Sequence, residues 1–482
     1  SSPAPTPTLA PVPESTPPVR NESSTSCDAD AASASNPLLP ASSVVDFSVP
    51  ASPPSLAPPS PNAELLVLLD CMTPSRPTGN AALPHLRARR LVNSGNMCFT
   101  NSVLQLLVYS PPLWNLFRQL DDLKGQRGTG GPNTSGGGTP LVDATVRFFE
   151  EFMNKEEPPP TQQPTQQAAG GNPRESEVAK KEPNAVDPFE PMYLYDAMKK
   201  KRQLKLLLDG QQQDAEELFR LYLDALDEEL LALLASICAH NSATVAPGVE
   251  EREVSQSGQI VMKRGLTSVE SPLMRIFGGK FRSTVRTPNQ PDTVNIEDWR
   301  SLQLDIQHDS VHAIEDALAR ISHLQPVQLG PSCSSESLEP EASQQVQIEV
   351  LPPILVLHLK RFLYDVAADG IVKISKHVRF APELEIPLEI MAPIAEKPAE
   401  PLHYRLYGIL YHHGESAGSG HYTVDVLHQN GDSGSEEAWL HIDDEAVRAV
   451  RHEDVFGGHD DERVDGRCAY MLFYCRIAPA WT

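Results

Sequence analysis

The stretch that most constrains the fold spans residues 91–110, where one cysteine stands between a polar turn and an apolar segment. Residues 93–96 read Asn-Ser-Gly-Asn, and the residues after Cys98 are apolar at helical spacing as far as Pro111. We therefore expect Cys98 in the first turn of a buried helix. Unpaired backbone N–H groups and the positive end of the helix dipole favour a thiolate there. Cys98 is either an activated nucleophile or a small buried core residue, and this stretch alone leaves both interpretations open.

Two residues near the C-terminus have the chemistry that a thiol nucleophile needs. His421 begins a strand of alternating apolar residues, and Asp443 ends the next strand, at 439–443. If these strands pair as a hairpin, the carboxylate can reach the imidazole and orient it, as in a Cys/His/Asp triad. Each residue also has an ordinary interpretation as a solvated strand-end group. The adjacent Asp444 is a second candidate for the carboxylate.

Acyl transfer through a tetrahedral intermediate also requires hydrogen-bond donors for the oxyanion. The backbone N–H of Cys98 is one candidate, and the side-chain amide of Asn93 is another. Asn93 is equally well explained as a plain turn or capping residue. Gly420, directly before His421, has no side chain and lets a substrate backbone pass close.

The amino-acid composition limits the kinds of binding partner and the cellular compartment that we expect for this chain. The 482 residues carry a formal net charge of −24, which argues against broad electrostatic binding to nucleic acid and suits a basic protein partner. Seven cysteines without a CxxC pair fit neither a disulfide framework nor a structural zinc site. We therefore expect no metal, no cofactor and a reducing compartment, the cytoplasm or also the nucleus. No apolar run is long enough to span a bilayer, so we expect no membrane partner.

Low-complexity segments divide the chain. Residues 1–62 are rich in Pro, Ser and Ala and are predicted to be a disordered leader, followed by a linker at 63–87. A catalytic domain is predicted over 88–477, with flexible insertions near 124–140, 155–185 and 238–262, because periodic segments resume after each insertion. Helices are expected within 91–117, 141–153, 211–234 and 310–324, and the folded sequence resumes at 188–208. Strands are expected within 273–287, 294–306, 345–365, 377–388, 404–411, 421–427, 439–443 and 468–476. Helices followed by antiparallel strands predict an α+β fold.

In this order, four segments resemble the motifs of the ubiquitin-specific proteases, a papain-like family of deubiquitinating cysteine peptidases. NSGNMCFTNSVLQ at 93–105 resembles the cysteine box of that family. QQQDAEELF at 211–219 and LPPILVLHLKRF at 351–362 resemble two segments that follow it. YRLYGILYHHGESAGSGHYTVDV at 404–426, with WLHIDDEAV at 439–447, resembles the histidine box. The resemblance implies a papain-like fold with a helical thumb, an antiparallel-sheet palm and β fingers.

The resemblance also implies catalytic roles. Cys98 would be the nucleophile, His421 the general base and acid, and Asp443 the orienting carboxylate. Asn93 would donate a hydrogen bond to the oxyanion. The expected activity is thiol-dependent hydrolysis of the (iso)peptide bond after the C-terminal glycine of ubiquitin, on conjugated proteins or chains.

Four further residues are implied at the substrate site. Asp214 and Glu217 match acidic positions that contact the basic tail of ubiquitin, and arginine side chains bind carboxylates strongly. Gly420 ends a loop that shifts to admit ubiquitin. Asp444, the second aspartate of its pair, is expected to support this site.

The implied partners are ubiquitin and ubiquitinated proteins. FGGKFRS at 277–283 and the leader also resemble a branch that works with a separate RNA-binding cofactor protein, so an activator that binds the leader is a further candidate partner. The zinc ribbon that many members carry in the fingers is missing, which implies fingers held together by packing alone. Two other functions use the same residues: a non-catalytic ubiquitin-binding scaffold, and a different cysteine acyl transferase of the transglutaminase type.

Overall fold

The structure is a computed structural model that describes most of the chain beyond residue 85. The described residues, all within the unit 59–482, are 86–126, 138–153, 187–209, 213–239, 253–254, 260–261, 271–287, 290–327, 342–366, 369–393, 401–416, 419–429, 437–457 and 466–477. The predicted leader and nearly all of the linker and the three insertions lie outside them. The domain boundaries therefore stay predictions.

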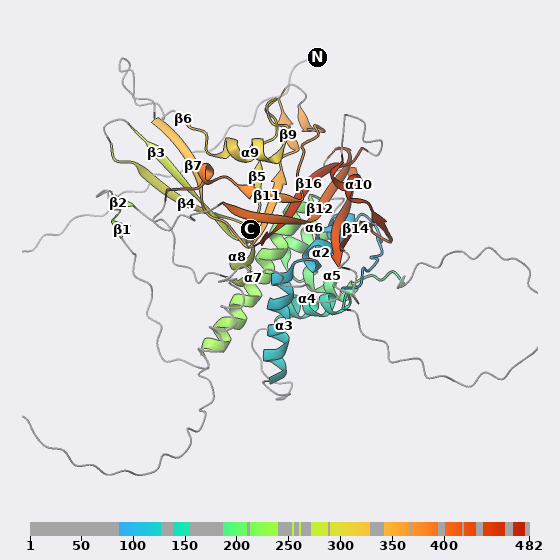
Figure 1. Ribbon diagram of the computed structural model, residues 1–482. Coiled ribbons are helices and arrows are strands. Elements are labelled where there is room, and N and C mark those ends of the chain that lie inside the picture. The colour runs from blue at the N-terminus through green and yellow to red at the C-terminus, as the bar shows by residue number, and fades with distance from the viewer. Residues whose placement is uncertain are drawn as a thin grey trace, which may run out of the picture. The chain divides into compact units, whose positions relative to one another are not determined.

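Helices make up the first half of the described chain, and α2 lies at their centre (Figure 1). All eleven residues of α2 are buried, because helices pack on one side of it and strands β12 and β13 on the other. The helix expected within 141–153 is α4, and one face of it, including Phe148 and Phe149, is buried. The helices of this half are α2 (Cys98–Val108), α3 (Pro111–Gln126), α4 (Pro140–Glu150), α5 (Met192–Lys199), α6 (Arg202–Leu208) and α7 (Ala215–Ala239). Among the described helices, none combines the length and the apolar character that crossing a membrane requires.

Strands dominate the second half and form a large sheet of eight strands. Its order is β15-β14-β13-β12-β16-β8-β5, with β11 also paired to β12, and its described pairs are antiparallel except β5 with β8. The fold class is confirmed as α+β. The strands are β5 (Leu302–Leu304), β8 (Ile354–Leu359), β11 (Glu383–Ile386), β12 (Leu402–Ser416), β13 (Ser419–Gln429), β14 (Glu437–Asp443), β15 (Ala446–Val450) and β16 (Cys468–Ile477).

A second sheet of four strands has the order β4-β3-β7-β6. Two separate hairpins, β1–β2 and β9–β10, complete the described strands. The remaining elements are β1 (Glu253–Val254), β2 (Ile260–Val261), α8 (Pro272–Phe277), β3 (Gly279–Arg286), β4 (Thr293–Trp299), α9 (Ile314–Ile321), β6 (Gln325–Val327), β7 (Ala342–Val350), β9 (Phe362–Asp365), β10 (Gly370–Lys373), η1 (Leu388–Ile390) and α10 (His452–Phe456).

The large sheet separates two hydrophobic cores, because successive side chains of a strand point to opposite faces. Tyr422, Val424 and Val426 of β13 belong to the core that contains α2. Tyr411 of β12 and Trp439 of β14 belong to the other core, which also includes α9. This alternation decides which residues of β13 and β14 share a face with His421.

One expectation for the strands was wrong. The segment 273–277 is not strand but lies in helix α8, because the side chain of Ser271 accepts a hydrogen bond from the Met274 N–H and Pro272 occupies the first turn. The strand expected within 377–388 is β11, Glu383–Ile386. Strand β15 was not expected at all.

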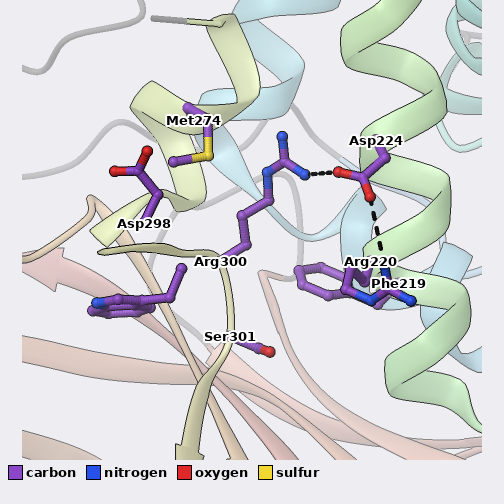
Figure 2. A pocket seen from close by; sticks show the side chains of 8 residues that line it. Phe219, Arg220, Asp224, Met274, Asp298, Arg300 and Ser301 are labelled. Carbon is purple, nitrogen blue, oxygen red and sulfur yellow. Dashed lines mark hydrogen bonds and ion pairs between the residues drawn. The ribbon is translucent and has the colours of Figure 1, made fainter. Parts of the chain in front are cut away.

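Polar contacts attach the turn between β4 and β5 to α7 (Figure 2). Figure 2 shows Arg300 in this turn paired with Asp224 of α7. Arg300 is also paired with Asp227 of α7, and Ser301 Oγ donates a hydrogen bond of 2.6 Å to Glu216. A cavity of about 280 Å³ lies beside these contacts, between α7, α8 and the turn. These contacts hold the four-stranded sheet against α7, the helix at whose N-terminal end Asp214 and Glu217 lie.

Candidate active site

Cys98 is the first residue of α2, as the sequence predicts. A turn leads into the helix, with positive φ angles of 108° at Gly95 and 56° at Asn96. The N–H of Met97 donates a hydrogen bond of 2.8 Å to Oδ1 of Asn93, so Asn93 closes this turn. The Cys98 side chain is buried. Since the first N–H groups of a helix have no acceptor within it, the N–H of Cys98 is a donor available to an anion at this site.

His421 lies between a thiol and a carboxylate. Strands β13 and β14 form the expected hairpin, with Val424 opposite Ile442, and this register brings the start of β13 to the end of β14. Nε2 of His421 lies 2.6 Å from Oδ1 of Asp443, and the ring is also hydrogen-bonded to Cys98. The three side chains expected to form a triad are therefore brought together.

The surroundings of His421 favour its protonated ring. The hydrogen bond with Cys98 is the main cause that raises the pKa of His421 to about 9; partial burial acts against this increase, and the hydrogen bond with Asp443 adds to it. An imidazolium beside a thiol is an arrangement that supports a thiolate nucleophile. The same ring can later protonate a leaving amine, so one residue has the geometry for both proton transfers.

Asp444 joins the end of β14 to the start of α2. Its two carboxylate oxygens accept hydrogen bonds of 2.8 Å from the side-chain amides of Asn93 and Asn101, and its backbone oxygen accepts one of 3.1 Å from Leu91 N–H. Burial raises the pKa of Asp444, although the two amides act in the opposite direction. The oxyanion role of Asn93 stays a prediction; one N–H of its amide is engaged by Asp444, and the amide carries a second.

Asn101 is a site residue that the sequence analysis missed. Its Oδ1 accepts a hydrogen bond of 2.8 Å from the Tyr195 hydroxyl, while its Nδ2 donates to Asp444. The side chain is fully buried within α2. An amide within a helix predicted to be buried was the signal available, since buried polar groups need partners.

Asp214 and Glu217, the two acidic residues expected at the substrate site, lie at the start of α7. Asp214 directly precedes the helix, and its Oδ1 accepts a hydrogen bond of 2.7 Å from Glu216 N–H. Its Oδ2 accepts one of 2.6 Å from the Tyr470 hydroxyl. Burial is the main cause that raises the pKa of Tyr422, and the negative charge of Asp214 adds to the effect. Glu217 is exposed.

Gly420 is enclosed by its neighbours. A Cβ atom at this position would lie 2.4 Å from Nε2 of His412 and 2.4 Å from the backbone oxygen of His413. Packing against β12 therefore requires a glycine here, whether or not a substrate passes close to it.

The side chains that could ligate a metal are already bonded to one another or to neighbours. Among the described residues, His421, Asp443 and Asp444 place ligand-type atoms within 4.8 Å of one another. The hydrogen bond between His421 and Asp443, and the two amides that bind Asp444, account for this cluster.

Comparisons with known proteins agree with this geometry. Residues 89–474 match the family model described as ubiquitin carboxyl-terminal hydrolase. The chain is 31% identical over 450 residues to the probable ubiquitin carboxyl-terminal hydrolase 3 of Schizosaccharomyces pombe, covering 86% of this chain and 78% of that protein. It is 35% identical over 416 residues to ubiquitin carboxyl-terminal hydrolase 10 of Gallus gallus, covering 81% of this chain and 49% of that protein. The chain thus spans about half the length of that vertebrate relative.

A solved structure supports the fold. The chain matches the SAGA Ubp8/Sgf11/Sus1/Sgf73 DUB module bound to ubiquitin aldehyde, with a TM-score of 0.54 and 18% sequence identity. The match covers 81% of this chain and 70% of that one. At this identity the likeness concerns the fold alone.

Proposed function

Because this chain belongs to the ubiquitin carboxyl-terminal hydrolase family, we propose that Cys98, His421 and Asp443 hydrolyse the (iso)peptide bond after the C-terminal glycine of ubiquitin. The chain is then a cysteine-type deubiquitinase whose substrates are ubiquitinated proteins and ubiquitin chains. The observation that carries this assignment is the position of His421, hydrogen-bonded to Cys98 and 2.6 Å from Asp443.

The reaction has two halves. In the first, the Cys98 sulfur attacks the carbonyl carbon of the terminal glycine, and the N–H of Cys98 and the Asn93 amide stabilise the oxyanion. His421 gives its proton to the leaving amine, which leaves a thioester between ubiquitin and Cys98. In the second half, His421 takes a proton from water, the resulting hydroxide attacks the thioester carbonyl, and ubiquitin leaves with a free carboxylate. Asp443 orients the imidazole throughout.

We further propose that Asp214 and Glu217 bind the basic tail of ubiquitin. Glu217 is exposed, and the carboxylate of Asp214 is held at the start of α7 by hydrogen bonds from Glu216 N–H and the Tyr470 hydroxyl. Carboxylates at this position suit arginine side chains that lead into the site. Charge-reversing changes at Glu217 should raise KM for ubiquitin substrates and leave kcat nearly unchanged, because this residue does not contact the reacting atoms.

A ubiquitin that carries a C-terminal electrophile tests the assignment of the nucleophile. The wild-type chain should form a covalent adduct, and Cys98→Ala should form none. Cys468→Ala is the matched control, since Cys468 is another free cysteine that is partly accessible, and this variant should react like the wild type. Equal labelling of Cys98→Ala and the wild type would show that the proposed nucleophile is wrong.

Two proposals rest on the sequence alone. We propose that an activating protein binds residues 1–62, a segment outside the described residues, and that the chain works in the cytoplasm or the nucleus. Cleavage of a panel of linkage-defined di-ubiquitins, with and without residues 1–62, would show whether that segment affects activity. Fluorescence microscopy of the tagged chain would test the location.

A further inference from the structure

Strands β13 and β14 carry a second imidazole–carboxylate pair beside the catalytic one. Asp425 and His441 lie opposite each other in the register of the hairpin, and Nδ1 of His441 is 2.6 Å from Oδ1 of Asp425. Because side chains alternate along a strand, Asp425 shares a face of β13 with His421, and His441 shares a face of β14 with Asp443. The two pairs are neighbours on one face of the sheet, with histidine and aspartate exchanged between the strands.

The second pair differs from the first in burial. The side chains of His421 and Asp443 are 36% and 45% exposed, whereas those of His441 and Asp425 are 9% and 0% exposed. A carboxyl group without access to water is stable only when partners replace the solvent. The side chains of the second pair are therefore shielded from solvent by the surrounding protein, while those of the catalytic pair are partly exposed to solvent.

Arg467 adds a cation to the buried pair. Its Nη1 lies 3.5 Å from Oδ2 of Asp425, and its Nη2 donates a hydrogen bond of 3.2 Å to the backbone oxygen of Asp454 in α10. The guanidinium also lies 4.7 Å from the centre of the Tyr411 ring of β12. Arg467 directly precedes β16. It therefore connects the carboxylate of Asp425 with β12 and with α10.

The geometry of the catalytic pair depends on the register of this hairpin. A slip of one residue between β13 and β14 would turn the side chains of one strand to the other face. Thr423, between His421 and Asp425 on the same face, is bonded through Oγ1 to Nε2 of His413 at 2.8 Å. Since His413 lies opposite His421 in the β12–β13 pairing, polar contacts on this face hold β13 from both neighbouring strands.

We propose that Asp425, His441 and Arg467 form a positioning network that holds β13 and β14 in the register that keeps Asp443 against His421. This inference rests on the proposed function and deepens it. The three residues act through the hairpin, so they are positioning residues. Their loss should weaken the hold of Asp443 on His421 and leave the ubiquitin-binding positions at the start of α7 unchanged.

The test compares Asp425→Asn with wild type by three readouts. In ubiquitin hydrolysis, kcat should fall roughly 100-fold, as for a small displacement of a catalytic group, while KM changes by less than about twofold. In alkylation of Cys98 by iodoacetamide, followed on its peptide by mass spectrometry, the rate at pH 6 should fall several-fold. The basic limb of the kcat/KM profile should move to lower pH, toward that of Asp443→Asn, because a displaced carboxylate no longer stabilises the imidazolium.

Glu229→Gln is the matched control, since it also neutralises a buried carboxyl group. Glu229 lies in α7, fifteen residues beyond Asp214, and accepts hydrogen bonds from Leu141 and Val142 N–H. If Asp425→Asn shifts the pH profile and the alkylation rate no more than Glu229→Gln at equal folded fraction, the network is merely structural and the proposal is overturned. If Asp425→Asn does not fold, His441→Gln is measured by the same criteria. Alkylation needs no ubiquitin, so an inactive wild type would refute the proposed function separately.

Discussion

Nδ2 of Asn93 donates a hydrogen bond of 2.8 Å to Oδ2 of Asp444, although 351 residues separate them in the chain. Asn101 donates an equally short bond to the other oxygen of the same carboxylate. Asn93 and Asn101 flank Cys98, and Asp444 follows Asp443. One carboxylate therefore holds the start of the helix that carries Cys98 next to Asp443, the carboxylate bonded to His421.

We expect Asp444→Asn to lower kcat/KM roughly 100-fold, because an amide at this position can accept from only one of the two asparagines and must turn its own NH₂ toward the other. The change displaces the start of α2 relative to β14. Steady-state hydrolysis of a ubiquitin substrate measures it. Asp309→Asn, at an exposed position outside the site, is the control and should retain wild-type kinetics. Wild-type activity of Asp444→Asn would mean that the two asparagines do not need this acceptor.

Much of this site follows from local sequence patterns. The apolar spacing after Cys98 predicts the helix that begins at this residue, and the alternation after His421 predicts the strand that pairs with 439–443. Both patterns depend on neighbours within about ten residues, which is the range over which periodicity is informative. The meeting of Cys98 with His421 was expected only through chemistry and family resemblance, since no local pattern encodes a contact across more than 300 residues.

What escaped prediction depends on long-range partners or on weak local signals. The role of Asn101 is defined by Tyr195 and Asp444, and that of Asp425 by His441 and Arg467, which no spacing rule links. Helix α8 was mistaken for strand because its six residues are too few for a helical period to be visible. In that segment the Ser-Pro start was the better signal.

The pH dependence of catalysis should carry the signature of His421. Its pKa is raised to about 9, first by the hydrogen bond with Cys98 and further by Asp443. Since the protonated ring is the form that serves the leaving amine, kcat/KM should stay high through neutral pH and fall as pH rises through about 9. Asp443→Asn removes a group that raises this pKa, so the basic limb should move to lower pH and kcat should fall. A pH–rate profile of both proteins measures the shift. An unchanged basic limb in Asp443→Asn would assign that limb to another group.

Gly420→Ala should disable the site by crowding. The added Cβ would lie 2.4 Å from the backbone oxygen of His413, which cannot move as a flexible side chain can. Strand β13 must shift away from β12 at the residue before His421, and we expect a fall in kcat of roughly 100-fold. Gly138→Ala is the control, since a Cβ there meets nothing within 4 Å. Full activity of Gly420→Ala would mean that this part of the hairpin accommodates the methyl group without moving His421.

Glu229→Ala should destabilise the fold and leave the chemistry intact. One oxygen of this buried carboxylate accepts hydrogen bonds of 2.9 and 3.0 Å from the N–H groups of Leu141 and Val142, at the start of α4. Alanine leaves these donors without that acceptor, so we expect the free energy of unfolding to fall by about 1–3 kcal/mol. Urea denaturation measures this change.

The neighbouring Glu228→Ala is the control for that loss, because Glu228 is exposed and pairs only with Lys201 at the surface among the described contacts. Exposed ion pairs contribute little, so its effect should stay below about 1 kcal/mol. Because Glu229 lies far along α7 from Asp214, kcat per folded molecule should match wild type for both variants. A loss of stability in Glu229→Ala no larger than that in Glu228→Ala would show that water replaces the carboxylate at the start of α4.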